Sequence, residues 1–140
     1  MSNEPITVEC TVQVPINQVW SAWNTPAEIT QWNAASDDWH TTAAEVDLRE
    51  GGRFTSRMEA KDGSHGFDFG GTYTKVDSGK RLQYKMDDER QVLVEFIDNG
   101  DGSVTVRETF DTENTHTREM QQQGWQAILD NFKRHVEAKA

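Results

Sequence analysis

Glu108 is the residue whose type and position most suggest chemistry. It lies in a stretch where inward and outward positions alternate as in a β-strand, and it falls on the same inward face as Val104, Val106 and Phe110. A carboxylate on an inward face needs a partner, or burial raises its pKa. Glu108 would then be a polar anchor or a general base inside an apolar cavity. The alternative is a β-bulge that turns it outward, or a place at the wet rim of a pocket.

Two histidines are the other candidates for acid–base chemistry. His40 follows Asp37, Asp38 and Trp39 in an irregular polar stretch over 33–42, which we expect to be a loop. His65 lies at the tip of a hairpin over 63–66. An imidazole titrates near neutral pH, so either residue can serve as an acid or a base. The alternative for both is a solvated loop histidine.

Large apolar side chains gather on the expected inner faces, and they have two interpretations. One is a packed core. The other is a partly hollow core lined by aromatic rings, as small-molecule pockets are. On the second interpretation, the predicted ligand-binding residues are Trp32, Trp39, His40, Phe54, Met58, Phe67, Phe69, Tyr73, Glu108 and Trp125.

Glycines inside regular elements favour the hollow core. Gly70, Gly71 and Gly124 lie within expected elements, where each costs about 0.5–1 kcal/mol relative to alanine. Such glycines mark a bulge or the close approach of another group. We therefore expect a strand or a ligand to come close to Gly124, beside Trp125.

The chain lacks the motifs of metal, nucleotide and nucleophile chemistry. It has no Gly-rich dinucleotide or phosphate loop, no nucleophile elbow and no paired His or Cys at metal-ligand spacing. We expect no cofactor and no metal. The stretch 98–102 is a hairpin turn, because it lacks the acids of a calcium loop. The single cysteine, Cys10, is expected to be a core thiol.

Composition bounds the class of protein. The 140 residues suit a single domain spanning 1–140. The 24 acidic and 14 basic side chains give a net charge of −10, which repels nucleic acid and anionic membranes. No apolar stretch is long enough to insert into a bilayer. With no signal-peptide pattern and no cysteine pair, the sequence indicates a cytoplasmic protein.

Periodicity predicts the elements that must position these residues. We expect strands over 6–14, 44–48, 53–59, 67–73, 82–86, 92–96 and 104–110. Short helices are expected at 16–23 and from Pro26, with Thr25 as its N-cap. A long helix is expected over 113–136, with apolar residues on a single face. This order predicts an α+β fold in which a curled antiparallel sheet holds the last helix.

Several short motifs resemble those of one family. Their positions are 14–20, 48–54, 69–73, 81–84, 106–110 and 123–125 with Leu129. In order and spacing they are similar to the START-like (SRPBCC, Bet v-like) superfamily. The branch that they resemble contains the C-terminal domain of the activator of the ninety-kilodalton heat-shock chaperone ATPase.

The resemblance implies a fold and leaves three functions open. The implied fold is the helix-grip: a seven-stranded antiparallel sheet around a long C-terminal helix, with two short helices after the first strand. The leading hypothesis is a protein that binds a small hydrophobic or aromatic molecule. The second is a cyclase- or hydrolase-type enzyme that uses Glu108, His40 or His65. The third is a chaperone-interaction module, which predicts an exposed apolar patch.

Overall fold

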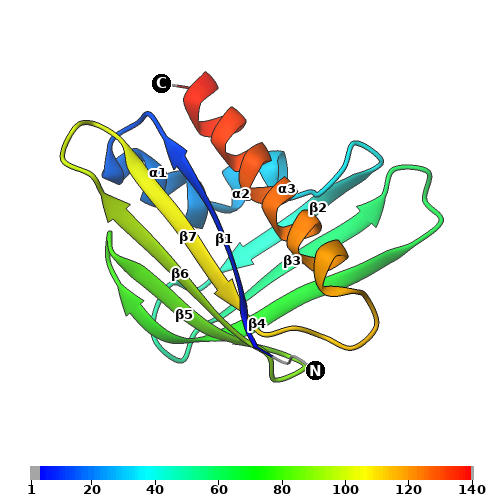
Figure 1. Cartoon of the computed structure of the whole chain (residues 1–140). Helices are drawn as coiled ribbons and strands as arrows, with labels where there is room; N and C mark the ends of the chain where they lie inside the picture. Colours follow the sequence, from blue (N-terminus) through cyan, green and yellow to red (C-terminus); the bar gives the residue numbers. More distant parts are fainter. Residues whose placement is uncertain (1–3, 140) are drawn as a thin grey trace.

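The computed structural model describes residues 4–139, which form one seven-stranded sheet and three helices (Figure 1). The strands are β1 (Ile6–Val12), β2 (Trp39–Val46), β3 (Arg53–Ala60), β4 (Gly66–Asp77), β5 (Arg81–Met86), β6 (Gln91–Asp98) and β7 (Val104–Phe110). The helices are α1 (Ile16–Asn24), α2 (Pro26–Trp32) and α3 (Arg118–Ala138). Within this part of the chain, no helix has the length and apolar character that a membrane span requires.

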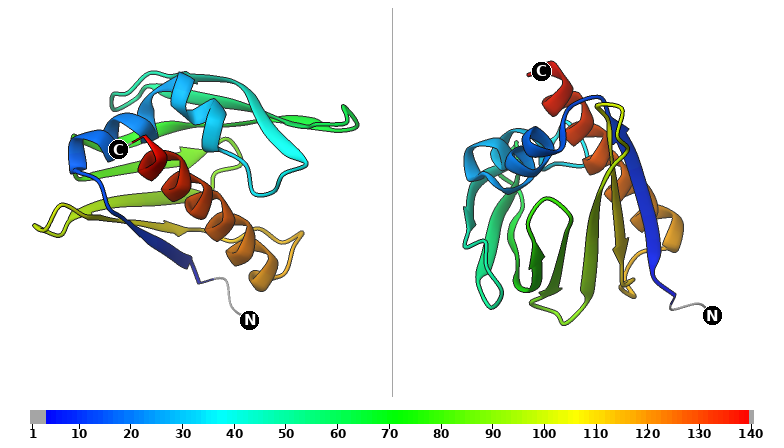
Figure 2. Two further views of the ribbon diagram at one scale, coloured as in Figure 1. Left: turned by 90° about the horizontal axis from the view of Figure 1, so that it is seen from above. Right: turned by 90° about the vertical axis from the view of Figure 1, so that its left-hand side faces the viewer.

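The sheet is antiparallel throughout, and its strands run in the order β1-β7-β6-β5-β4-β3-β2. It curls so that its concave face receives α3, as the two views of Figure 2 show. Residues of β7 alternate between buried and half-buried along the whole strand. This period of two is the signature of one face turned to a core. The expected α+β helix-grip fold is therefore confirmed.

The two short helices connect the opposite edges of the sheet. They join β1 to β2 and lie at one end of the curl (Figure 2). Pro26 occupies the first turn of α2, where its missing N–H is not needed. Thr25 is the N-cap by position, but its hydroxyl does not cap α2. It donates instead to the carbonyl oxygen of Ser21 at 2.6 Å, because Thr25 also ends α1.

The C-terminal half of α3 anchors the helix in the core. Leu129 and Phe132 are fully buried, and Val136 is 3% exposed. The ring of Phe132 meets the rings of Trp23 and Trp32 edge to face, each at a centroid distance of 4.9 Å. Such aromatic contacts add to the large apolar area that the rings bury. This half of α3 therefore holds the helix against α1, α2 and the sheet.

The long helix begins at Arg118, five residues later than the periodicity predicted. The Thr117 hydroxyl accepts a hydrogen bond from the Met120 amide at 3.1 Å and so caps the helix. Before it, residues 113–116 form a loop that Gln121 holds. The Gln121 side-chain amide donates to the carbonyl oxygens of Glu113 and His116, and its oxygen accepts from the Glu113 amide. The buried Gln121 replaces the helical bonds that this loop lacks.

Strand β2 begins at Trp39, inside the stretch that we expected to be a loop. Trp39 and His40 pair with Ala60 and Glu59 of β3, and the register shifts after Thr41. A bulge breaks the alternation of inward and outward side chains, so the sequence pattern hides this part of the strand. The buried Thr41 hydroxyl donates to the carbonyl oxygen of Asn33 at 2.6 Å. The expected loop is therefore shorter than 33–42.

Gly70 and Gly71 permit a close approach of neighbouring strands, as predicted. A Cβ on Gly71 would lie 2.6 Å from the carbonyl oxygen of Lys85 on β5. A Cβ on Gly70 would lie 2.9 Å from the carbonyl oxygen of Phe54 on β3. Neither backbone atom can move easily, so any larger residue would push the strands apart. These glycines let β4 run between β3 and β5 behind the aromatic wall.

Candidate ligand-binding site

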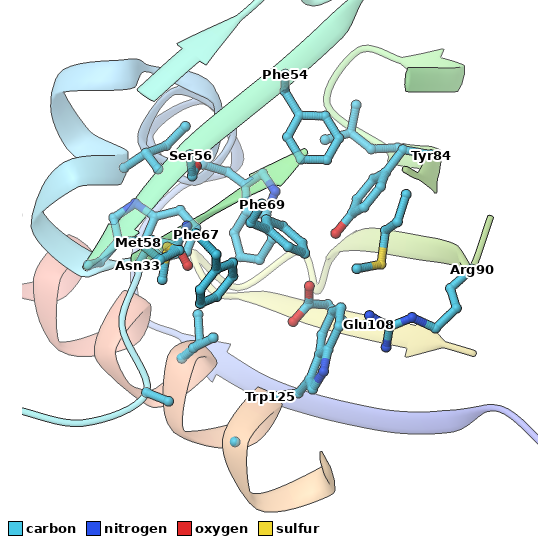
Figure 3. Close-up of a pocket in the computed structure, with 18 of the residues that line it drawn as sticks. Asn33, Phe54, Ser56, Met58, Phe67, Phe69, Tyr84, Arg90, Glu108 and Trp125 are labelled. Atoms are coloured by element: carbon cyan, nitrogen blue, oxygen red, sulfur yellow. The ribbon is translucent and has the colours of Figure 1, made fainter. Parts of the chain in front are cut away.

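A cavity of about 490 Å³ lies between the inner face of the sheet and the N-terminal half of α3 (Figure 3). Small-molecule sites commonly measure roughly 300–1,000 Å³ and have mostly apolar walls. Here apolar and aromatic side chains from the helices and from β3, β4 and β5 make up most of the lining. They are Trp23, Ile29, Trp32, Phe54, Met58, Phe67, Phe69, Tyr73, Leu82, Tyr84, Met86, Met120, Trp125 and Ile128.

One wall is a cluster of rings on the central strands. Phe54 of β3 meets Tyr84 of β5 edge to face at a centroid distance of 4.7 Å. It also contacts Tyr73 of β4 at 5.2 Å and Phe69 at 5.9 Å. Tyr73 and Tyr84 face each other across the β4–β5 pairing. The strand register thus places four rings side by side, and Figure 3 shows Phe54, Phe69 and Tyr84 turned toward the cavity.

The opposite wall is the first two turns of α3, around Trp125. Its ring stacks on that of Phe110 in β7 with centroids 4.0 Å apart and planes 8° apart. The stack fixes the indole as a rigid surface. Gly124 also lines the cavity, and a Cβ there would meet no atom within 4 Å. No strand therefore approaches Gly124, which was one of the two expected reasons for a glycine there. The missing side chain instead leaves open space beside Trp125.

Glu108 points into this cavity from β7 (Figure 3). Strand β7 pairs with β1 and β6 without a bulge, so the predicted outward turn does not occur. The residue is 4% exposed, which also excludes a wet rim. Burial raises the pKa of its carboxyl from 4.5 to about 8. Burial is the cause of this shift, and no hydrogen bond from residues 4–139 contributes to it.

Tyr84 and Arg90 lie at the same end of the cavity. Tyr84 is 7% exposed, and its hydroxyl is directed toward the Glu108 carboxyl (Figure 3). Burial raises the pKa of Tyr84 well above its ordinary value, and the charge of Glu108 raises it further. Arg90 precedes β6, and its Nε donates to Asp88 at 2.8 Å. This leaves the terminal nitrogens of the guanidinium facing the cavity end.

His116 also lines the cavity, at the loop before α3. Its Nδ1 lies 2.9 Å from Oε2 of Glu113, and its backbone amide donates to the other carboxylate oxygen. Its side chain is half exposed, so it belongs to the mouth of the cavity. The carboxylate orients the ring and leaves Nε2 unengaged. The sequence pattern hid this pair because it placed both residues inside the helix.

The structure brings together eight of the ten predicted ligand-binding residues. The eight that line the cavity are Trp32, Phe54, Met58, Phe67, Phe69, Tyr73, Glu108 and Trp125. Trp39 and His40 do not line it, because they continue β2 past its bulge and face a separate polar surface hollow. The ring of Trp39 instead supports Phe67 at a centroid distance of 5.9 Å. His65 lies in the exposed β3–β4 connection, away from the cavity.

Two polar residues that line the cavity, Arg90 and Gln121, were not predicted from the sequence. The spacing of apolar residues does not identify them, since Arg90 lies in the turn before β6 and Gln121 lies at a polar position of α3. Thr117 was the residue in the sequence that could have marked the start of α3, because threonine is a favoured N-cap.

Cys10 is a part-buried thiol whose pKa burial raises to about 12, which agrees with the expected structural role. Within residues 4–139, no three His, Cys, Asp or Glu side chains cluster as metal ligands.

Comparison with known proteins places the chain in a family. Residues 13–137 match the family model described as Activator of Hsp90 ATPase homolog 1-like protein. The chain belongs to this AHSA1-like family. The AHSA1-like protein from Aeromonas hydrophila is 53% identical, with a TM-score of 0.87 over 96% of this chain and 94% of that one.

Two further solved structures show how far the AHSA1-like fold extends. A protein from Cytophaga hutchinsonii is 47% identical, with a TM-score of 0.83 over 99% of this chain and 94% of that one. A protein from Nitrosomonas europaea is 18% identical, with a TM-score of 0.82 over 99% of this chain and 97% of that one, and shows the fold alone. No curated protein matches the chain. The predicted superfamily branch is confirmed.

Proposed function

We propose that this protein binds a small hydrophobic or aromatic molecule in the cavity between the sheet and α3. The observation that carries the proposal is a cavity of about 490 Å³ with aromatic walls, into which Glu108 points a carboxyl that no hydrogen bond from residues 4–139 is found to stabilise. A packed core would fill this space, because protein interiors leave few voids larger than a water molecule. A buried polar group without a partner is costly, unless a ligand supplies the partner.

The placement of exposed apolar groups supports a ligand over a docking partner. The large apolar side chains exposed in residues 4–139 are Phe67, at 50%, and Met120, at 57%. Both line the cavity, one from β4 and the other from α3. They therefore form the mouth of the cavity. The chaperone-interaction hypothesis requires a separate exposed apolar patch, and these two side chains do not form one. An apolar molecule entering the cavity would cover them.

The test is native mass spectrometry after incubation of the protein with a cell extract. Gly124→Leu places a larger side chain in open space at the cavity wall, and Gly124→Ala is the matched control. We expect the natural protein and the alanine variant to retain a small molecule that the leucine variant loses. A natural protein that retains nothing, or equal retention by the leucine variant, contradicts the proposal.

The second candidate is an enzyme acting on a hydrophobic substrate, and of the three residues predicted for it Glu108 lines the cavity. His40 and His65 lie away from the cavity, while the His116–Glu113 pair lines it. A carboxylate that orients an imidazole is a common arrangement for a general base. If extract-derived ligands are turned over, His116→Ala should abolish turnover and leave retention intact. Unchanged turnover in that variant removes this candidate.

A further inference from the structure

Three polar groups from different segments converge at one end of the otherwise apolar cavity. Glu108 comes from β7, Tyr84 from β5, and Arg90 from the turn before β6. Tyr84 pairs with Val92, and Val92 with Phe110, two residues beyond Glu108. One intervening strand thus separates the two side chains on the same inner face. Figure 3 shows the phenol, the carboxyl and the guanidinium gathered beside Trp125.

The polar groups at this end of the cavity make few hydrogen bonds within the described part of the protein. Within the described residues, no hydrogen bond contributes to the raised pKa of the Glu108 carboxyl or of the Tyr84 hydroxyl. Arg90 commits its Nε to Asp88, and its two terminal nitrogens bond to no residue of 4–139. In residues 4–139 no fully buried side-chain polar atom lacks a partner, so the polar atoms of these three groups are open to the cavity. An oxygen of a ligand that enters the cavity can therefore accept their hydrogen bonds.

The chemistry of the three groups selects the kind of partner. Arg90 can only donate hydrogen bonds. Burial raises the pKa of Glu108 to about 8, so at neutral pH its carboxyl is mostly protonated and donates. The Tyr84 phenol can also donate. Three converging donors match an oxygen with lone pairs or negative charge, whereas an ammonium group would meet the positive charge of Arg90.

On the condition that the cavity is a ligand site, as proposed above, we infer the class of its ligand. It is an aromatic compound that bears a carbonyl, phenol or enol oxygen, and Tyr84, Glu108 and Arg90 bind that oxygen. The aromatic part lies between Trp125 and the rings of Phe54 and Phe69. While Glu108 is protonated, the three donors stabilise partial negative charge on the bound oxygen.

Calorimetric titration of the full chain at pH 7 with three naphthalene compounds tests the assignment. Naphthalene has no polar group, 2-naphthol carries an oxygen, and 2-(aminomethyl)naphthalene carries an ammonium. We expect 2-naphthol to bind roughly 10- to 100-fold more tightly than naphthalene, and the ammonium compound no more tightly than naphthalene. Equal affinity for naphthol and naphthalene, or tightest binding of the ammonium compound, overturns the assignment and leaves the cavity a ligand site. Failure of all three to bind overturns the proposed function as well.

Two variants locate the donors. Tyr84→Phe and Glu108→Leu should each reduce the preference for naphthol over naphthalene by roughly tenfold. Glu108→Gln keeps an N–H donor and should retain part of the preference. Tyr73→Phe, the matched control, removes the hydroxyl of another ring in the cavity lining and should change both affinities alike. A preference unchanged in Tyr84→Phe and Glu108→Leu refutes the assignment.

A spectroscopic readout separates binding of the oxygen from an effect on folding. In Glu108→Gln, where the neighbouring side chain stays neutral and keeps a donor, the ultraviolet absorption of naphtholate should appear at lower pH for the bound compound than for the free one. Adding Tyr84→Phe to this variant should return the ionisation toward that of free naphthol. In Glu108→Gln, bound naphthol that ionises at the same pH as free naphthol, or at a higher pH, contradicts the donor site.

Discussion

Replacing Glu108 by glutamine should change how the stability of the protein depends on pH. Burial raises the pKa of this carboxyl from 4.5 to about 8, and within residues 4–139 no hydrogen bond or ion pair offsets the cost. The unfolded chain exposes the carboxyl to water and ionises near the ordinary value. Glutamine has nearly the same shape, stays neutral and can still donate a hydrogen bond.

The sign and size of the effect follow from linkage. Below pH 4.5 the carboxyl is protonated in both states and costs nothing. As pH rises toward 8, the unfolded state loses its proton first, so the free energy of unfolding falls. Each pKa unit corresponds to 1.36 kcal/mol. At pH 7 the natural protein should therefore have lost about 3 kcal/mol relative to Glu108→Gln.

Two groups whose pKa is raised by burial and further by the charge of Glu108, Cys10 and Tyr84, do not titrate in this range. Burial raises the pKa of Cys10 to about 12, and it holds the pKa of Tyr84 well above its ordinary value. The difference between the natural protein and Glu108→Gln thus isolates one carboxyl.

Urea unfolding followed by tryptophan fluorescence, from pH 5 to pH 8.5, measures this difference. We expect the two proteins to have similar stability at pH 5 and to diverge as pH rises, with the glutamine variant the more stable. Glu119→Gln makes the same charge change at an exposed site and is the control. Parallel curves for the natural protein and Glu108→Gln across this range would refute a buried, unpartnered carboxyl.

Four further substitutions test the two halves of α3, the mouth of the cavity and the loop before the helix. Gly124→Ala should raise the free energy of unfolding by about 0.5–1 kcal/mol in urea titration, because the added Cβ meets open space and favours the helix. Phe132→Ala should lower it by about 3–5 kcal/mol, whereas Phe67→Ala at the half-exposed mouth should lower it by about 1 kcal/mol or less. Gln121→Ala should lower it by about 1–3 kcal/mol and speed hydrogen exchange at the Glu113 amide; equal exchange would show that Gln121 does not hold the loop.

Alternation of apolar residues was enough to predict the strands that line the cavity. Glu108 kept its inward position because β7 runs without a bulge, so the simple period of two applied. The same rule failed at Trp39 and His40, where a bulge in β2 shifts the register and no residue type announces it. The period of a strand predicts a face only as far as the pairing stays regular.

The site was harder to predict than the fold because its polar groups come from turns and caps. Periodicity could not locate Arg90, which a turn aims at the cavity. It also extended the last helix through Glu113 and His116, because it gives no weight to the Thr117 cap and the Gln121 side-chain bonds. Hydrogen bonds of single side chains decide such boundaries, and they depend on the folded arrangement.

The central claim is that a small aromatic molecule binds between the sheet and α3. The most direct test is a titration of the ¹⁵N-labelled protein with 2-naphthol, followed by two-dimensional NMR. We expect saturable shifts concentrated at the amides of Glu108, Gly124 and Trp125, with Trp39 and His40 little changed. Shifts that gather around Trp39 and His40, or no saturable shift at the cavity, would contradict the claim.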